Sequence, residues 1–233
     1  MQTSHRKRHK PRALVIAAST GGPQVVQDIC KRIGSACSEI PLFIVVHLPD
    51  GYAETFAAQL QRASGLPTMA SRESTPVQAG HIYVAASGVH LTLARTGPDI
   101  RLHHDFAEPV NFCRPAADVL FSSAASIYGP DITAIVLSGM GSDGLNGCRA
   151  IARAGGQILV QDEASSAVWG MPGAIARSEI DCVILPPDDI AHRVRISMQA
   201  PPQYRSQIPL QDLPKSVLEE NWQGMAVSRE RAT

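Results

Sequence analysis

The sequence predicts an α/β protein, with a doubly wound, mostly parallel sheet, helices on both faces and an antiparallel β-hairpin insertion. Two observations support this fold class. Short runs of apolar and β-branched residues, such as residues 13–18, alternate with segments such as residues 25–33, in which apolar residues recur at helical spacing. The 233 residues also suffice for one substantial core with at most a small appendage.

The first part of the chain has the order strand, helix, strand, helix. A buried strand is expected over Ala13–Ala18, and Pro23 and Gly34 suit the start and the end of the helix that follows. A second strand is expected over Pro41–His47, and a second helix runs through Thr55–Leu60. This order implies a right-handed crossover, and therefore parallel strands.

The middle of the chain has a different pattern. Three short strand candidates occur at His81–Ala86, Val89–Leu93 and Ile100–His104. They are separated by Ser87-Gly88 and by Thr96–Asp99, which are turn signals of antiparallel hairpins. We therefore expect a β insertion or an edge of the main sheet here, and not a separate domain.

The alternation of helices and strands then returns. Strands are expected at Ile132–Leu137, Gln157–Val160 and Cys182–Leu185, and helices at Ala116–Tyr128, Leu145–Ala154, Gly173–Arg177 and Ile190–Met198. The predicted organisation is a basic, disordered arm over residues 1–12, one domain over residues 13–200 and a polar tail over residues 201–233.

Composition and charge argue against several classes of protein. The 21 basic and 21 acidic residues balance, so no overall field attracts the chain to nucleic acid or to an anionic membrane. No apolar run is long enough to cross a bilayer, and no signal peptide is recognisable. The five cysteines form no C-x-x-C pair, which suits reduced thiols packed mostly as small core residues. We therefore expect a cytoplasmic protein without membrane insertion.

Three reactive side chains follow predicted strands. Ser19 and His47 stand at the ends of the first two strands, and Asp143 follows the strand that ends at Leu137. Because the carboxyl ends of parallel strands meet at one edge, where open α/β sheets bind ligands, we expect the three to converge. A hydroxyl, an imidazole and a carboxylate can serve as nucleophile, base and orienting group. The sequence therefore points to a serine hydrolase.

Each of the three residues also has a plainer interpretation. A serine before two glycines, like Ser19, is more often a helix cap or a loop residue. His47 alone is as compatible with core packing, and Asp143 in Gly-Ser-Asp-Gly suits a turn or the cap of the following helix. Their shared place at one edge is what favours a site. The turn around Ser19 is not the G-x-S-x-G elbow of α/β-hydrolases, so kinship with that fold is not expected.

Neither a cofactor nor a metal is expected. The turn at residues 19–22 follows a strand, but it lacks both the G-x-G-x-x-G pattern and the lysine of a phosphate-binding P-loop. The acidic residues Asp50, Asp143, Asp162 and Glu163 show no close metal-ligand spacing.

Five ordered motifs resemble those of one known family. They are Ala18–Pro23, His47–Pro49, Pro109–Asp118, Gly139–Gly144 and Gln161–Ser165, the last accompanied by Gly170–Pro172. Together they resemble the catalytic domain of the bacterial chemotaxis protein-glutamate methylesterases (CheB-type), over approximately residues 14–196. Five motifs in the same order are far more specific than any single glycine cluster.

The resemblance implies roles for five residues. Ser19 would be the nucleophile, His47 the general base and then the acid, and Asp143 the orienting carboxylate. The backbone N–H of Met140 would stabilise the oxyanion, and Thr20 would line the site. The implied reaction removes methyl esters from glutamate side chains of chemoreceptor cytoplasmic helices through an acyl-enzyme, often with deamidation of glutamines, and needs no cofactor.

Two other interpretations stay open at this stage. One is a non-catalytic scaffold that binds receptor helices, and the other is an esterase or amidase for a different substrate. No chemistry is assigned to Asn111, Arg114 or Asp118, because a buried structural Arg–Asp network explains them equally well.

The sequence also departs from the family pattern at two points. Ala17 stands where the family commonly has glycine. Only twelve residues precede the first strand, too few for the family's typical amino-terminal receiver domain. Three interpretations stay open: a constitutively active enzyme, control by a separate regulatory protein, or a piece of a longer chain.

Overall fold

The computed structural model describes residues 10–199, so most of the expected arm (residues 1–12) and all of the expected tail (residues 201–233) lie outside the described residues. The strands are β1 (Ala13–Ala18), β2 (Leu42–Val46), β3 (Thr68–Ala70), β4 (Ile82–Val84), β5 (His90–Thr96), β6 (Asp99–Asp105), β7 (Ile132–Val136), β8 (Gln157–Gln161) and β9 (Val183–Leu185). The helices are α1 (Gly22–Ile33), α2 (Ala53–Ser64), α3 (Ala117–Tyr128), α4 (Leu145–Arg153), α5 (Met171–Ala176) and α6 (Pro187–Gln199), with short 3₁₀ helices η1 (Gly34–Cys37) and η2 (Gly129–Asp131).

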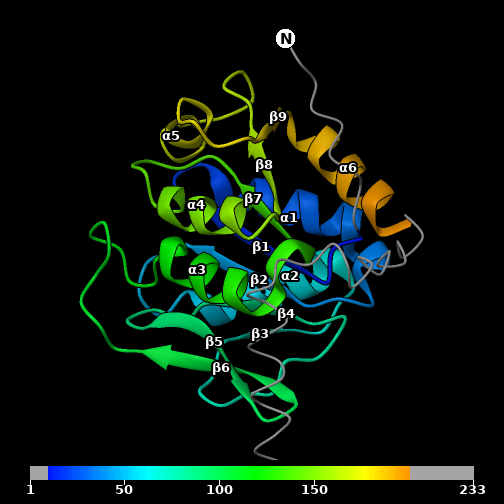
Figure 1. The fold of residues 1–233 in the computed structure, drawn as a ribbon, viewed down its shortest axis with the longest axis vertical. Coiled ribbons are helices and arrows are strands. Elements are labelled where there is room, and N and C mark those ends of the chain that lie inside the picture. Colours follow the sequence, from blue (N-terminus) through cyan, green and yellow to red (C-terminus); the bar gives the residue numbers. More distant parts are fainter. Residues whose placement is uncertain (1–9, 200–233) are drawn as a thin grey trace, which may run out of the picture. The chain divides into compact units, whose positions relative to one another are not determined.

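Seven of the nine strands in residues 10–199 form one sheet in the order β3-β4-β2-β1-β7-β8-β9. All of its neighbouring strands are parallel. The chain extends the sheet outward from β1 on one side through β2, and later on the other side through β7 (Figure 1). The sheet is therefore doubly wound, as predicted, and β1 lies at the switch point where such sheets bind ligands.

Both faces of this sheet are covered by helices, which explains why β1 and β2 are apolar at every position. In β1, Leu14 and Ile16 belong to a core cluster shared with α1, α2 and α6, whereas Ala13 and Val15 belong to a second cluster with α3, α4 and α5. Figure 1 shows these two sets of helices on opposite sides of the sheet. Each fully buried leucine, isoleucine or valine contributes about 1.5–3 kcal/mol, so the sheet is a rigid base for its edge.

The middle of the chain corrects one prediction. β5 and β6 form the expected antiparallel hairpin, with Thr96 paired to Asp99 at its tip. β4, however, is not part of a hairpin, because Ile82–Val84 pairs in parallel with β2 and is buried on both faces. The antiparallel interpretation of His81–Ala86 is therefore wrong, and the three-residue strand β3 beside β4 was not foreseen.

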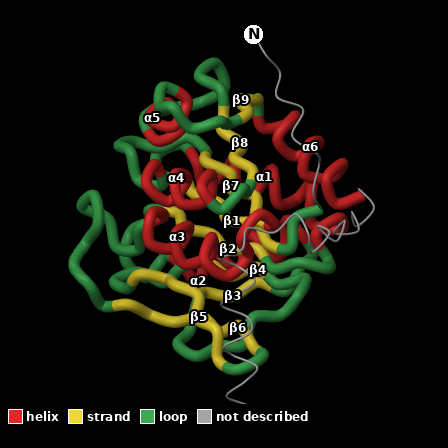
Figure 2. The backbone as a smooth tube through the Cα atoms, in the orientation of Figure 1, coloured by secondary structure: helices red, strands yellow, loops and turns green. Residues whose placement is uncertain are grey.

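Residues 106–116 connect β6 to α3 and project sideways from the sheet as a long loop, drawn in green in Figure 2. No helix within residues 10–199 is long and apolar enough to cross a membrane.

Candidate active site

The sheet ladder sets Ser19 and His47 side by side. Ala18 of β1 pairs with Val46 of β2, and each of the two reactive residues follows directly. The backbone N–H of His47 donates to the carbonyl of Ala18 (3.1 Å), and that of Ser19 donates to the carbonyl of Ser138 beyond β7 (3.0 Å). The hydrogen bonds of the core therefore continue into the candidate site, and the backbone of both residues is fixed.

Asp143 reaches His47 from the loop between β7 and α4. Nε2 of His47 lies 2.9 Å from Oδ2 of Asp143, which is the geometry of a ring N–H that donates to a carboxylate. The side chain of Asp143 is 1% exposed and that of His47 is 17% exposed. These two predicted residues are therefore brought together across 96 positions of sequence.

The first turn of α3 holds the carboxylate of Asp143. Oδ2 accepts the backbone N–H of Ala117 (2.7 Å), and Oδ1 accepts those of Asp118 (3.0 Å) and Gly144 (2.9 Å). The N–H groups at the start of a helix have no partners inside the helix, and they favour negative charge. A buried carboxylate is thus satisfied as an anion, and its orientation toward His47 is fixed.

The environment of Ser19 suits a nucleophile. Its hydroxyl is half-buried and has no hydrogen-bond partner among residues 10–199. Because Nε2 of His47 is occupied by Asp143, the ring nitrogen that can accept a proton from the serine is Nδ1, whose neighbour in this structure is Sγ of Cys113 at 3.7 Å. No Ser19–His47 hydrogen bond is formed within the described chain, and such bonds often tighten only when substrate is present.

The segment after β7 packs closely against Ser19. A Cβ atom added at Gly139 would lie 2.9 Å from Cβ and 3.0 Å from the backbone nitrogen of Ser19, so only glycine fits there. The N–H of Met140 donates to no acceptor within residues 10–199, as an oxyanion donor requires before substrate binds. Thr20 is exposed beside Ser19, and its carbonyl accepts a hydrogen bond from Ser138 Oγ (2.8 Å). The structure thus places both residues at the same edge.

Cys113 is the neighbour of the site that sequence reasoning missed. Its Sγ lies 3.7 Å from Nδ1 of His47 and 3.4 Å from the carbonyl of Asn111. Burial, and then the charges of Asp143 and Asp118, raise the pKa of its thiol to about 11. Of the five free cysteines, Cys113 and Cys182 are half-buried, whereas the other three are the expected core residues. Nothing in the spacing of the cysteines could have found this contact.

His47, Cys113 and Asp143 are close enough to share a metal ion, with ligand atoms within 4.8 Å of one another. Both oxygens of Asp143 already accept two hydrogen bonds each, and Cys113 carries a protonated thiol. Metal ligation would require a thiolate and free carboxylate lone pairs. The arrangement therefore suits proton transfer better than metal binding.

Asp118 anchors the loop that carries Cys113. Its Oδ2 accepts Nδ2 of Asn111 (2.9 Å), and its Oδ1 accepts the backbone N–H of Gly147 in α4 (2.8 Å). Burial is the main cause of its raised pKa, and the charge of Asp143 adds to it. Arg114 donates to the carbonyls of Phe106 (3.5 Å) and Ala107 (3.2 Å). The supposed Arg–Asp network is thus replaced by an Asn–Asp contact.

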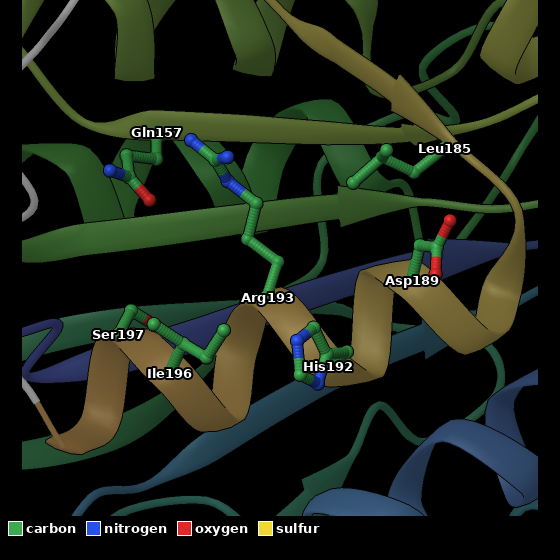
Figure 3. Close-up of a pocket in the computed structure, with 7 residues that line it drawn as sticks. All are labelled: Gln157, Leu185, Asp189, His192, Arg193, Ile196 and Ser197. Atoms are coloured by element: carbon green, nitrogen blue, oxygen red, sulfur yellow. The ribbon is translucent and has the colours of Figure 1, made fainter.

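Two of the hollows in the surface of the described chain bear on where a ligand could bind. One of about 450 Å³ adjoins the site, because it is lined by Gly21 after the nucleophile turn and by Leu48 after His47, with Tyr52 from the start of α2. The other, of about 320 Å³, lies between α6 and β8, and Figure 3 shows Arg193 extending across it toward Gln157. None of the residues that line this second hollow belongs to the candidate site.

A serine, a histidine and a buried carboxylate at the carboxyl edge of a doubly wound parallel sheet define a class of protein, one with the layout of a serine hydrolase. The sequence also matches the family described as CheB methylesterase over residues 14–194. The chain belongs to this family.

Individual relatives and one solved structure agree with this assignment. The chain is 44% identical over 186 residues to a protein-glutamate methylesterase/protein-glutamine glutaminase of Nitrobacter hamburgensis, covering 80% of this chain and 49% of that protein. It is 37% identical over 181 residues to one of Trichodesmium erythraeum, covering 78% and 51%. The crystal structure of the Thermotoga maritima CheB methylesterase catalytic domain superposes with a TM-score of 0.76 at 28% identity, over 80% of this chain and 98% of that one. The chain spans about half the length of these curated relatives.

Proposed function

We propose that this chain is a protein-glutamate methylesterase that also deamidates glutamine side chains, with residues 13–200 as its catalytic domain. The observation that supports it best is the pair of His47 and Asp143, joined at 2.9 Å beside Ser19 on the sheet edge. The relatives from Nitrobacter and Trichodesmium carry both activities in their names. The substrates would be methylated cytoplasmic helices of chemoreceptors, so the enzyme would act in the cytoplasm.

The first half of the reaction forms an acyl-enzyme. Nδ1 of His47 takes the proton of Ser19 as Oγ attacks the ester carbonyl of the methylated glutamate. Asp143 stabilises the imidazolium that forms, and the N–H of Met140 receives the developing oxyanion. The imidazolium then returns its proton to the leaving oxygen, and methanol departs. With a glutamine substrate the same proton goes to nitrogen, and ammonia departs.

The second half restores the enzyme. A water molecule gives a proton to Nδ1 of His47 as its oxygen attacks the acyl carbonyl. When the second tetrahedral intermediate collapses, the imidazolium returns that proton to Oγ of Ser19, and the glutamate leaves with a carboxyl group that then loses its proton to solvent. No cofactor enters either half. The roles assigned to Ser19, His47, Asp143, Met140 and Thr20 thus follow from their shared position and from the family's chemistry.

Mass spectrometry of a methylated receptor helix before and after incubation tests this function. Wild-type protein is expected to remove 14 Da per methylated glutamate and to add about 1 Da per deamidated glutamine, figures that are about the masses of CH₂ and of an NH₂-to-OH exchange. Ser19→Ala should abolish both changes. Ser126→Ala, an exposed serine on α3, is the matched control and should leave them intact.

A fluorophosphonate probe separates the enzyme from a receptor-binding scaffold. An active hydrolase should be labelled at Ser19, and the label should disappear in Ser19→Ala but not in Ser126→Ala. An unlabelled wild-type protein that still binds the receptor helix would support the scaffold. Labelling without any change in the receptor helix would support an esterase or amidase for a different substrate.

A further inference from the structure

Asn111 and Phe112 form an unusual tight turn in the loop between β6 and α3. Val110 and Cys113 exchange two backbone hydrogen bonds, of 3.1 and 2.9 Å, across the two residues between them. Those residues have φ angles of +52° and +62°. Two-residue turns with both φ angles positive favour Asn at the first position and Gly at the second. Asn111 fits this pattern, whereas a phenylalanine at the second position is strained.

Packing does not explain why a phenylalanine stands there. Phe112 has a relative exposure of 103%, so its ring gains nothing from burial in the described fold. A glycine would fit the backbone better and would expose no aromatic surface. Strained residues that the fold does not need occur mostly at functional sites, where the strain belongs to the mechanism or to binding.

The turn is held at a fixed place beside the reacting groups. Asn111 is tied to Asp118 at the start of α3, and Cys113 lies 3.7 Å from Nδ1 of His47. Since consecutive Cα atoms are 3.8 Å apart, the backbone of Phe112 is about 10 Å or less from the imidazole. The exposed ring is thus presented from a rigid base at a short distance from the general base.

Other apolar side chains stand on the same rim. Phe106 and Met140 are 74% and 73% exposed and, with Phe112, are the three most exposed large apolar side chains in residues 10–199. The carbonyl of Phe106 accepts a hydrogen bond from Arg114, next to Cys113, and Met140 lies on the loop of Asp143. A methyl ester alone is too small to contact Phe106, Phe112 and Met140 together, whereas the surface of a protein substrate is large enough.

We propose that Phe112 is a specificity residue, which binds an apolar side chain one to two helical turns from the modified glutamate on a helical protein substrate. This inference rests on the proposed function and adds to it how the substrate is selected. One turn of helix advances about 5.4 Å, so a side chain at that spacing from the glutamate matches the short distance between Phe112 and His47. The free energy gained when Phe112 binds the apolar side chain of the substrate would offset the backbone strain at this position.

The test uses two peptides from one methylated receptor helix. They differ at a single position, three or four residues from the methylated glutamate, which is leucine in one peptide and serine in the other. Wild-type protein should show a kcat/KM about tenfold higher for the leucine peptide, since an aromatic anchor contributes at least that much at an interface. Phe112→Ala should process the two peptides equally, at the rate of the serine peptide.

A second variant shows whether the loss of discrimination comes from a missing phenylalanine ring or from a damaged structure. Phe112→Gly should lose the same discrimination while its Tm rises, because glycine relieves the strain. Ile184→Ala, an exposed apolar residue on β9, is the matched control and should keep the full preference.

Two outcomes would overturn the inference. The first is an unchanged preference for the leucine peptide in both Phe112 variants, and the second is a wild-type protein with no preference between the peptides at any apolar position tried. Failure of the proposed function would look different, because wild-type protein would then hydrolyse neither peptide.

Discussion

Two regions shape the candidate site, and they do so by different means. The strand ends at Ser19 and His47 are fixed by the parallel ladder of a fully buried sheet. The loop over residues 106–116 is fixed by a few polar contacts around Asp118, and it contains a strained turn. The strands thus position the groups proposed for the chemistry, and the loop supplies the surface that surrounds them. Substitutions in the two regions should therefore have different consequences.

Asp143→Ala should produce the largest effect, because this residue joins His47 to the start of α3, where the loop ends. It removes the acceptor of His47 and of three backbone N–H groups, at Ala117, Asp118 and Gly144. Esterase activity should fall by at least about 10³-fold, and the free energy of unfolding by about 2–5 kcal/mol. Peptide kinetics and urea denaturation measure the two quantities. A variant that lost activity at unchanged stability would contradict the role of α3 in holding this carboxylate.

Gly139→Ala tests the strand side, although the new methyl group would first displace the flexible side chain of Met171, whose Sδ would be the nearest atom. The new methyl group would lie about 3 Å from both the Cβ and the backbone nitrogen of Ser19, which the ladder holds in place. We expect about 10²-fold lower kcat and a loss of about 1–3 kcal/mol in unfolding free energy. Fluorophosphonate labelling kinetics report on the nucleophile directly. Labelling at the wild-type rate would show that the backbone of Ser19 moves freely, contrary to the geometry.

The reactivity of Cys113 tests the electrostatics on the loop side. Its pKa is raised to about 11, so the thiolate fraction near pH 8 should be about 100-fold below that of an ordinary cysteine. Alkylation by iodoacetamide should be correspondingly slow and should accelerate with rising pH up to that pKa. Peptide mapping after timed alkylation measures this rate. Fast alkylation of Cys113 at neutral pH would contradict its burial beside Asp143 and Asp118.

Phe112→Gly should give the smallest change in the fold, and the sign should be positive. Relief of the strain at φ +62° should raise the free energy of unfolding by about 1 kcal/mol. Thermal denaturation of the variant against Phe112→Ala, which keeps the strained backbone, isolates the effect. If Phe112→Gly were no more stable than Phe112→Ala, the backbone at position 112 would not be strained.

The two regions also differ in how far they could be predicted from the sequence. Unbroken apolar runs such as Ala13–Ala18 and Leu42–Val46 identify central strands, because only a sheet covered on both faces buries every residue. The proximity of Ser19 and His47 at one edge then follows from topology. β4 was misassigned because a three-residue buried strand looks the same in a parallel sheet and in a hairpin, and the turn signal at Ser87-Gly88 favoured the hairpin.

The loop could not be predicted, because its contacts are not periodic. Cys113 contacts His47 across 66 positions of sequence, and the Asp118 that binds Asn111 also accepts a hydrogen bond from Gly147 in α4. The left-handed backbone of Phe112 has no signature in composition, since phenylalanine is not a turn residue. Asn at position 111 was the one local hint of such a turn.

The position of β7 in the sheet has a consequence for synthesis of the chain. The adjacent strands that carry Ser19 and His47 are translated early, but Asp143 comes 96 residues after His47, and β7 must add to the opposite side of β1. A nascent polypeptide released before β7 would carry only Ser19 and His47 of the three reactive residues, on the half of the sheet formed by β1 to β4. Long-range pairing of this kind is slow, so the ability to cleave an ester would emerge only with completion of the fold.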